Sequence, residues 1–251
     1  MKILHIDIET SPNTAHVWGL FKNTVSIKQL MESSYTLCWA AKWHGISGIE
    51  FSGIHTEEPV EVVRKAWELL NEADAVCTWN GARFDIPTLN KEFLLYGFPP
   101  PDSYKQIDLL RVARREFRFP SNKLDYVAQT LGLGAKVKHE GHELWVKCMN
   151  NDPVAWKKME RYNKADVRLL ERVYKRLLPW VKDHPNYGLY VDTDRPACTN
   201  CGSTRVVKKG LEHTKTQSYQ RYRCTKCHTP LRGRFTTVPA SNRENILVQS
   251  K

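Results

Sequence analysis

Alternating apolar and polar residues predict a strand at residues 3–10. One face of this strand is entirely apolar, whereas the other carries two carboxylates, Asp7 and Glu9, two positions apart. At that spacing their Cα atoms lie roughly 7 Å apart, and the charges repel each other unless a cation or water lies between them. The stretch is therefore either a solvated edge strand or a central strand that contributes to a divalent-cation site. The apolar face holds Leu4, Ile6 and Ile8, and the opposite face holds Ile3, His5, Asp7 and Glu9.

The same kind of pattern predicts the elements that follow. Strands dominate the first part of the chain, and helices alternate with short strands later, which indicates a layered α/β domain. Strands are expected near 15–21, 35–44, 49–55 and 75–79, and helices near 57–70, 86–96, 109–117, 121–132 and 153–177.

The last of these helices carries a carboxylate on its apolar stripe. Asp152 and Pro153 favour a helix start, and Asp166 then lies among apolar residues, with Tyr162 one turn earlier on the same face. Because an unpaired carboxylate facing a core costs several kcal/mol, a basic group or a metal must neutralise Asp166. An arginine or backbone amides would suffice for this residue alone.

A further polar segment, Asn80-Gly-Ala-Arg-Phe84-Asp85, follows the short strand at 75–79. Asp85 is explained equally well as a cap of the next helix or as a ligand. Asp108 is best interpreted as the cap of the helix at 109–117.

Composition and charge narrow the class of protein. The 251 residues are 41% hydrophobic, no apolar run is long enough to span a membrane, and Met1-Lys2 leads directly into a strand. We therefore expect a cytoplasmic protein without membrane contact. Residues 195–251 carry 12 Lys/Arg and 2 Glu, a charge of +10, which leaves only +1 for residues 1–194. This concentration of positive charge predicts a polyanion-binding segment.

The same C-terminal segment contains two CxxC pairs 22 residues apart. In a reducing compartment, this arrangement favours a four-thiolate zinc site over disulfides or a redox dithiol. The strand that precedes the second pair places Tyr219, Arg221 and Arg223 on one face, where they would stack bases and bind phosphates. An ordinary exposed ribbon strand is the alternative. The zinc ligands are Cys198, Cys201, Cys224 and Cys227.

Three motifs in order, Asp7-x-Glu9, Asn80-x-x-x-Phe84-Asp85 and Tyr162-x-x-x-Asp166, resemble those of the DEDD 3′→5′ exonucleases. That superfamily has an RNase H-like fold, and the position of Tyr162 matches its tyrosine subtype. Ile8-Glu-Thr-Ser-Pro12, Trp156-Lys-Lys-Met159 and His184-Pro-Asn186 also resemble a phage and bacterial subfamily related to the exonuclease domain of family B polymerases, whose members often carry a C-terminal zinc ribbon.

The resemblance implies roles for these residues. Two Mg²⁺ or Mn²⁺ ions would be held by four carboxylates, Asp7 bridging both ions, Glu9 and Asp166 completing the first, and Asp85 holding the second. Tyr162 would orient the attacking water. Asn80 and Phe84 would shape the nucleic-acid pocket.

The resemblance thus implies a 3′→5′ exonuclease that releases nucleoside 5′-monophosphates in the cytoplasm of a bacterium or a phage-infected host cell. We expect an α/β fold with an RNase H-like mixed sheet flanked by helices, and a small zinc ribbon. The expected parts are the exonuclease domain at 1–185, a linker at 186–197, the ribbon at 198–238 and a flexible tail at 239–251. DNA is the expected partner, RNA the alternative, and replication or repair proteins are further candidates. A catalytically inactive nucleic-acid-binding protein and a structure-selective endonuclease are the rival functions; the sequence does not address the oligomeric state.

Overall fold

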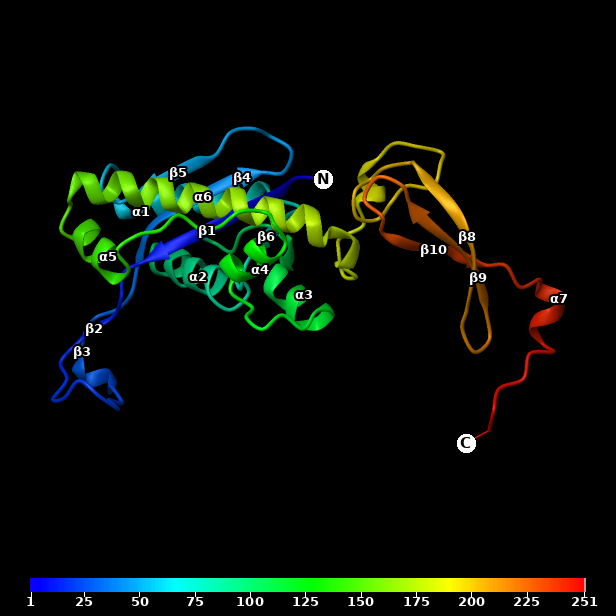
Figure 1. Ribbon diagram of the computed structural model, residues 1–251, viewed down its shortest axis with the longest axis horizontal. Coiled ribbons are helices and arrows are strands. Elements are labelled where there is room, and N and C mark those ends of the chain that lie inside the picture. Colours follow the sequence, from blue (N-terminus) through cyan, green and yellow to red (C-terminus); the bar gives the residue numbers. More distant parts are fainter. Residues whose placement is uncertain (251) are drawn as a thin grey trace. The chain divides into compact units, whose positions relative to one another are not determined.

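A computed structural model describes residues 1–250 of the chain. Its residues form two compact units, one comprising Lys2–Lys175 and the other comprising Met1 together with Arg176–Lys251. Each unit has its own sheet (Figure 1).

The first unit is built on a mixed five-stranded sheet in the order β5-β4-β1-β6-β7. Strand β1 is central: it pairs antiparallel with β4 and parallel with β6, which in turn pairs parallel with β7. The prediction of an α/β, RNase H-like mixed sheet is confirmed, and β1 is not an edge strand. The strands are β1 (Ile3–Thr10), β4 (Thr36–Trp43), β5 (Glu50–Gly53), β6 (Ala75–Thr78) and β7 (Lys105–Asp108).

Helices flank this sheet. The apolar face of β1 packs into a core with side chains of α1 and α2, including Val63, Leu70 and Leu89. A second core, around Leu37, Trp156 and Met159, joins β4 to α5 and α6. The helices are α1 (Pro59–Glu72), α2 (Asp85–Leu95), α3 (Leu109–Glu116), α4 (Leu124–Thr130), α5 (His142–Met149) and α6 (Pro153–Leu177).

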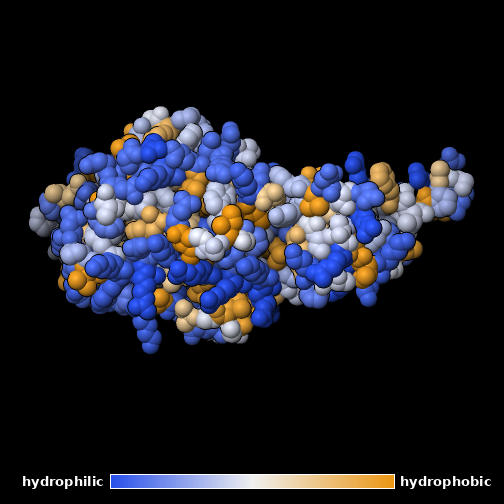
Figure 2. Space-filling model, turned by 90° about the horizontal axis from the view of Figure 1, so that it is seen from above, coloured by the Kyte–Doolittle hydropathy of each residue, from blue (hydrophilic) through white to orange (hydrophobic). Residues whose placement is uncertain are grey.

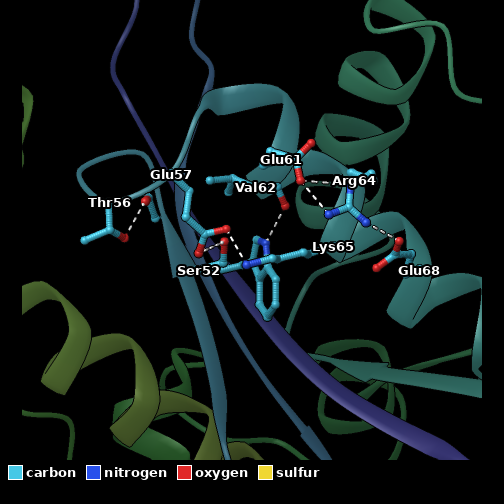
Figure 3. Close-up of polar contacts among 10 residues, drawn as sticks. Ser52, Thr56, Glu57, Glu61, Val62, Arg64, Lys65 and Glu68 are labelled. Carbon is cyan, nitrogen blue, oxygen red and sulfur yellow. Dashed lines mark hydrogen bonds and ion pairs between the residues drawn. The ribbon is translucent and has the colours of Figure 1, made fainter.

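Polar contacts fix the start of α1 against the sheet (Figure 3). The indole nitrogen of Trp39, on β4, donates to the carbonyl of Val62 at 2.8 Å. The hydroxyl of Ser52, on β5, donates to Glu57 at 3.0 Å, and Glu57 also pairs with Lys65 of α1. These contacts hold α1 over the apolar side of β1, so the opposite side of β1 remains for α6 and the carboxylates.

Two elements differ from the sequence-based expectation. The strand expected at 15–21 is only β2 (Thr14–Ala15), which pairs with β3 (Leu30–Glu32). Residues 16–29 between them form a loop that ends in a short 3-10 helix, Ile27–Gln29. This loop extends beyond the sheet (Figure 1), so its apolar residues have no neighbouring strand to pair with. Helix α5 was not predicted, because its eight residues are too few to show a clear periodicity.

The second unit contains a three-stranded antiparallel sheet in the order β10-β9-β8. The strands are β8 (Val206–His213), β9 (Ser218–Cys224) and β10 (Pro230–Thr236), and a short helix, α7 (Ala240–Arg243), lies in the segment predicted as a tail.

Polar groups dominate the surface seen in Figure 2, where apolar residues form only small scattered groups. No helix among the described residues combines the length and hydropathy that a bilayer span requires.

Candidate functional site

Carboxylates from β1 and α6 converge on one point. Asp7 and Glu9 project from the same face of β1, and Asp166 approaches from α6, so that one carboxylate oxygen of each lies within 4.8 Å of the others. Asp166 is 1% exposed. The structure therefore brings together three of the four carboxylates that the sequence singled out.

Asp85, the fourth carboxylate, lies beside this cluster on α2. Its Oδ1 accepts a hydrogen bond from the backbone amide of Ile8 at 3.1 Å, which ties the start of α2 to β1 next to Asp7. Phe84, not Asp85, occupies the cap position of α2. Asp108, by contrast, caps α3 as expected, since it accepts from the amide of Leu110 at 3.0 Å.

Burial and mutual repulsion make these carboxylates poor acids. Burial, followed by the charges of Glu9, Asp85 and Asp166, raises the pKa of Asp7 well above its usual value. Burial raises the pKa of Glu9 to about 8 and that of Asp85 to about 7. A cluster of this kind is stabilised in its ionised form only by added positive charge.

Lys136 supplies part of that charge, and the sequence analysis did not identify it. Its ammonium donates to Oδ2 of Asp166 at 2.5 Å and to the hydroxyl of Tyr162 at 3.1 Å. The base expected to neutralise Asp166 is therefore a lysine of the loop between α4 and α5. Its only signal in the sequence is a basic residue flanked by glycine and apolar residues, which is too common to be diagnostic.

Asn163 is a second residue that the sequence analysis missed. Its side-chain amide donates to Oδ2 of Asp7 at 2.8 Å and to the Asp7 carbonyl at 3.2 Å, so α6 holds the β1 carboxylate directly. Asn163 is completely buried. An asparagine on the apolar side of a helix, three residues before Asp166, was the available signal.

The donor set fits a hard divalent cation. One lysine faces a cluster of buried and partly buried carboxylates, and Oδ1 of Asp166 is buried with no hydrogen-bond partner among residues 1–250. Carboxylate oxygens are the ligands that Mg²⁺ and Mn²⁺ prefer. The residues present thus match such ions.

Tyr162 is held at the edge of the cluster by aromatic neighbours. His139 and Trp145 contact its ring edge-on, with centroids 4.7 and 6.0 Å away. Burial and the nearby carboxylates Glu9 and Asp166 raise the pKa of its phenol. The hydroxyl therefore remains protonated and can act as a hydrogen-bond donor.

The other two residues of the second motif are Asn80 and Phe84. Asn80 has a positive φ of 72°, and its amide donates to Asp108 at 3.0 Å. Phe84 is 44% exposed. Neither belongs to the carboxylate cluster, and their predicted contacts with nucleic acid stay predictions.

Gly81 makes the turn between β6 and α2 possible. A Cβ at this position would lie 2.4 Å from side-chain atoms of Thr78, and the Gly81 carbonyl accepts from the amide of Ile86 at 2.9 Å. We expect Gly81→Ala to lower the free energy of unfolding by about 1–3 kcal/mol, measured by denaturant titration. Gly48→Ala is the control, since nothing lies within 4 Å of that position; equal stability of the two variants would contradict the steric argument.

A histidine-rich group lies further along the same side of β1. Nε2 of His5 is 3.2 Å from Nδ1 of His44, which lies 3.5 Å from Glu171. Lys42 and Lys175 already pair with Glu171, at 3.1 and 2.9 Å. Burial lowers the pKa of His5 to about 3, so its ring is neutral. This group is a structural network rather than a cation site.

The four C-terminal cysteines form a separate cluster. Sγ of Cys198 lies 3.5 Å from Sγ of Cys227, and Sγ of Cys201 lies 3.6 Å from Sγ of Cys224. These distances are too long for disulfides and close to the roughly 3.8 Å expected between sulfurs that bind one Zn²⁺ tetrahedrally at about 2.3 Å. The cluster therefore fits a structural zinc ion.

Basic residues line a hollow of about 810 Å³ on the sheet of the second unit. Arg221 and Arg223 contribute to it, together with Lys209 and Arg232. Tyr219 is partly covered, because the guanidinium of Arg232 lies 4.3 Å from its ring centroid. Binding of nucleic acid by Tyr219, Arg221 and Arg223 stays a prediction.

Comparisons with known proteins agree with this architecture. The chain is similar in structure to the family B DNA polymerase from the hyperthermophilic archaeon Pyrobaculum calidifontis, with a TM-score of 0.54 and 19% sequence identity. The match covers 71% of this chain and 24% of the polymerase chain, and at this identity it shows the fold alone. No curated protein sequence matches. A family profile described as RNase_H_2, of the RNase H superfamily, matches residues 4–178. The chain therefore belongs to the RNase H superfamily.

Proposed function

We propose that this protein is a metal-dependent 3′→5′ exonuclease that hydrolyses nucleic-acid phosphodiesters to nucleoside 5′-monophosphates, with DNA as its substrate. The observation that carries the proposal is the convergence of Asp7, Glu9 and Asp166 around a common point, with Asp85 beside them. The resemblance of the three sequence motifs to those of 3′→5′ exonucleases supports the direction of cleavage, which the carboxylates alone do not specify.

Each residue has a distinct part in the proposed reaction. Asp7, Glu9, Asp85 and Asp166 would hold two Mg²⁺ or Mn²⁺ ions, with Asp7 shared between them. When bound, such ions activate water and stabilise the charge that develops on the phosphate and the leaving oxygen. Tyr162 would orient the attacking water through its protonated hydroxyl. Asn163 fixes the rotamer of Asp7, and Lys136 adds positive charge on the Tyr162 side.

In this proposal residues 1–185 supply the chemistry and the zinc ribbon at 198–238 supplies a handle for the substrate, with 186–197 as a linker and 239–251 as a tail. The charge distribution supports this division, because the segment from Arg195 onward carries +10 and the rest only +1. Replication or repair proteins are further proposed partners.

The function is tested with single-stranded DNA and RNA labelled at either the 3′ or the 5′ end. We expect 5′-labelled DNA to shorten one nucleotide at a time, and 3′-labelled DNA to release labelled mononucleotide at once. EDTA should abolish both, and Mg²⁺ or Mn²⁺ should restore them. Cutting of circular single-stranded DNA would favour an endonuclease, and binding without any cleavage would indicate an inactive nucleic-acid-binding protein.

The ribbon's part is tested by removing two charges from the basic hollow. Arg221→Ala with Arg223→Ala should weaken binding to single-stranded DNA and reduce the log–log salt slope by roughly 1.4, because each lost phosphate contact contributes about 0.7. Lys215→Ala with Lys226→Ala removes the same charge from exposed positions outside the hollow. Equal losses in the two double variants would show that net charge, rather than this surface, attracts the substrate.

A further inference from the structure

The loop between β2 and β3, residues 16–29, exposes a concentration of large apolar side chains. Trp18 is fully exposed, and Phe21 is 88% exposed. Soluble proteins rarely leave such groups together in solvent without a binding role. Six apolar residues of this loop are exposed: Val17, Trp18, Leu20, Phe21, Val25 and Ile27.

Hydrogen bonds give the base of this loop a defined shape. The side chain of Gln29 donates to the carbonyl of His16 at 2.9 Å and accepts from the amide of Ser26 at 3.0 Å. The amide of His16 in turn donates to the carbonyl of Gln29 at 2.9 Å. Local polar contacts therefore build the loop, while its apolar side chains take no part in a core.

The loop is continuous with the candidate active site. It is separated from β1, whose last residues include Glu9, by residues 11–13 and the two-residue strand β2. A recess of about 340 Å³ beside Glu9 is lined by Thr10, Ser11 and Pro12 on one side, and by His139 and Trp145 on the other. His139 and Trp145 are also the aromatic neighbours of Tyr162. A chain bound at the carboxylates could thus pass through this recess toward the loop.

Charge selects the class of partner. From Ser11 to Met31 the sequence contains no Asp or Glu, whereas Lys22 and Lys28 lie among the exposed apolar residues. Exposed aromatic rings can stack on bases, and neighbouring lysines without nearby acidic residues can bind phosphates. Unpaired nucleic acid offers both accessible bases and phosphates, so it is the partner that this loop fits.

We propose that the 16–29 loop binds unpaired bases of the substrate strand by stacking on Trp18 and Phe21, with Lys22 and Lys28 contacting its phosphates. This inference rests on the proposed nuclease function, and it adds a binding surface that the catalytic carboxylates do not provide. Stacking tolerates any base, so the surface would favour single strands and frayed ends over paired ends without reading sequence.

The test compares W18A/F21A with L94A/L95A in the full-length chain. Leu94 and Leu95 lie on α2 and are 80% and 73% exposed, so their removal deletes a similar amount of exposed apolar surface outside the loop. Binding of a fluorescent oligothymidylate is measured by anisotropy, with Ca²⁺ in place of Mg²⁺. Hydrolysis of the p-nitrophenyl ester of thymidine 5′-monophosphate is measured with Mg²⁺, because this single nucleotide reports on the carboxylate site alone.

We expect W18A/F21A to bind the oligonucleotide at least about 10-fold more weakly, with unchanged hydrolysis of the nucleotide ester. L94A/L95A should match the wild type, and W18F/F21Y, which retains both rings, should bind normally. Equal affinity of W18A/F21A and wild type would overturn the proposal. Two further results would also overturn it. If oligonucleotide binding is unchanged but W18A/F21A no longer self-associates in sedimentation, the loop binds a second copy of the chain. If oligonucleotide binding is unchanged but binding to anionic vesicles is lost, the loop binds a lipid surface. If the wild type fails to hydrolyse the ester, the nuclease function fails, while a binding difference still supports the loop.

Discussion

Replacing Asp7 or Asp166 by alanine should reduce nuclease activity by about 1,000-fold or more, which corresponds to roughly 4 kcal/mol of lost transition-state stabilisation. Each substitution removes a proposed metal ligand from a cluster whose oxygens lie within 4.8 Å. Single-turnover cleavage of end-labelled DNA in saturating Mg²⁺ measures the loss. Near-wild-type turnover of either variant would remove these residues from the mechanism.

Stability in EDTA separates this effect from unfolding. Asp7 is partly buried among other carboxylates, and desolvation together with their charges raises its pKa, so Asp7→Ala relieves repulsion and should leave the melting temperature unchanged or higher. Glu143→Ala is the control, because Glu143 is an exposed carboxylate paired with Lys147 one turn away. Tyr162→Phe should lose less activity than Asp7→Ala, since it removes one hydrogen bond to water and no ligand.

Loss of one zinc ligand should unfold the ribbon. Of the residues in β8, β9 and β10, only Cys224 is buried, so these strands have almost no apolar core. Structural zinc supplies about 10–16 kcal/mol in small domains of this kind. We therefore expect Cys198→Ser to abolish binding of one zinc equivalent, measured by elemental analysis, and to make residues 198–238 sensitive to proteolysis.

Two comparisons sharpen this result. Cys148→Ser changes a buried thiol in the first unit and should leave zinc content unchanged. The Cys198→Ser variant should still hydrolyse the nucleotide ester, because the carboxylate cluster belongs to the other unit. A protease-resistant ribbon without zinc would show that the metal is not its structural centre.

How far the sequence predicted the site depended on the range of the interactions. Asp7 and Glu9 could be singled out as candidate site residues because strand alternation is a local property. Asp166 could be singled out because a carboxylate on an apolar stripe must be neutralised. The neutralising residue could not be assigned, since Lys136 meets Asp166 only after the loop that follows α4 returns to α6. Nor could the sequence distinguish Asp85 as a cap from Asp85 as a neighbour of Asp7, because the deciding hydrogen bond comes from Ile8, 77 residues away.

Helices and strands were likewise predictable where a local sequence pattern determines them. Strand β1 alternates, β4 is a short and largely apolar run, and helices α1 and α6 have clear periodicity, so all four were expected close to their observed places. The loop at 16–29 contains enough apolar residues to resemble a strand, and only the absence of a pairing neighbour decides its conformation. A local pattern carries no information about that neighbour.

The order of the elements along the chain has a consequence for biosynthesis. Strand β1 is synthesised before its partners, because its parallel partner β6 begins at Ala75 and the helix that contributes Asp166 extends to Leu177. Each of these pairings closes a long stretch of chain, which makes the assembly of the carboxylate cluster a late event in folding. A nascent chain that does not yet include α6 lacks Asp166 and Asn163. The carboxylate cluster therefore cannot be complete before that helix has been synthesised.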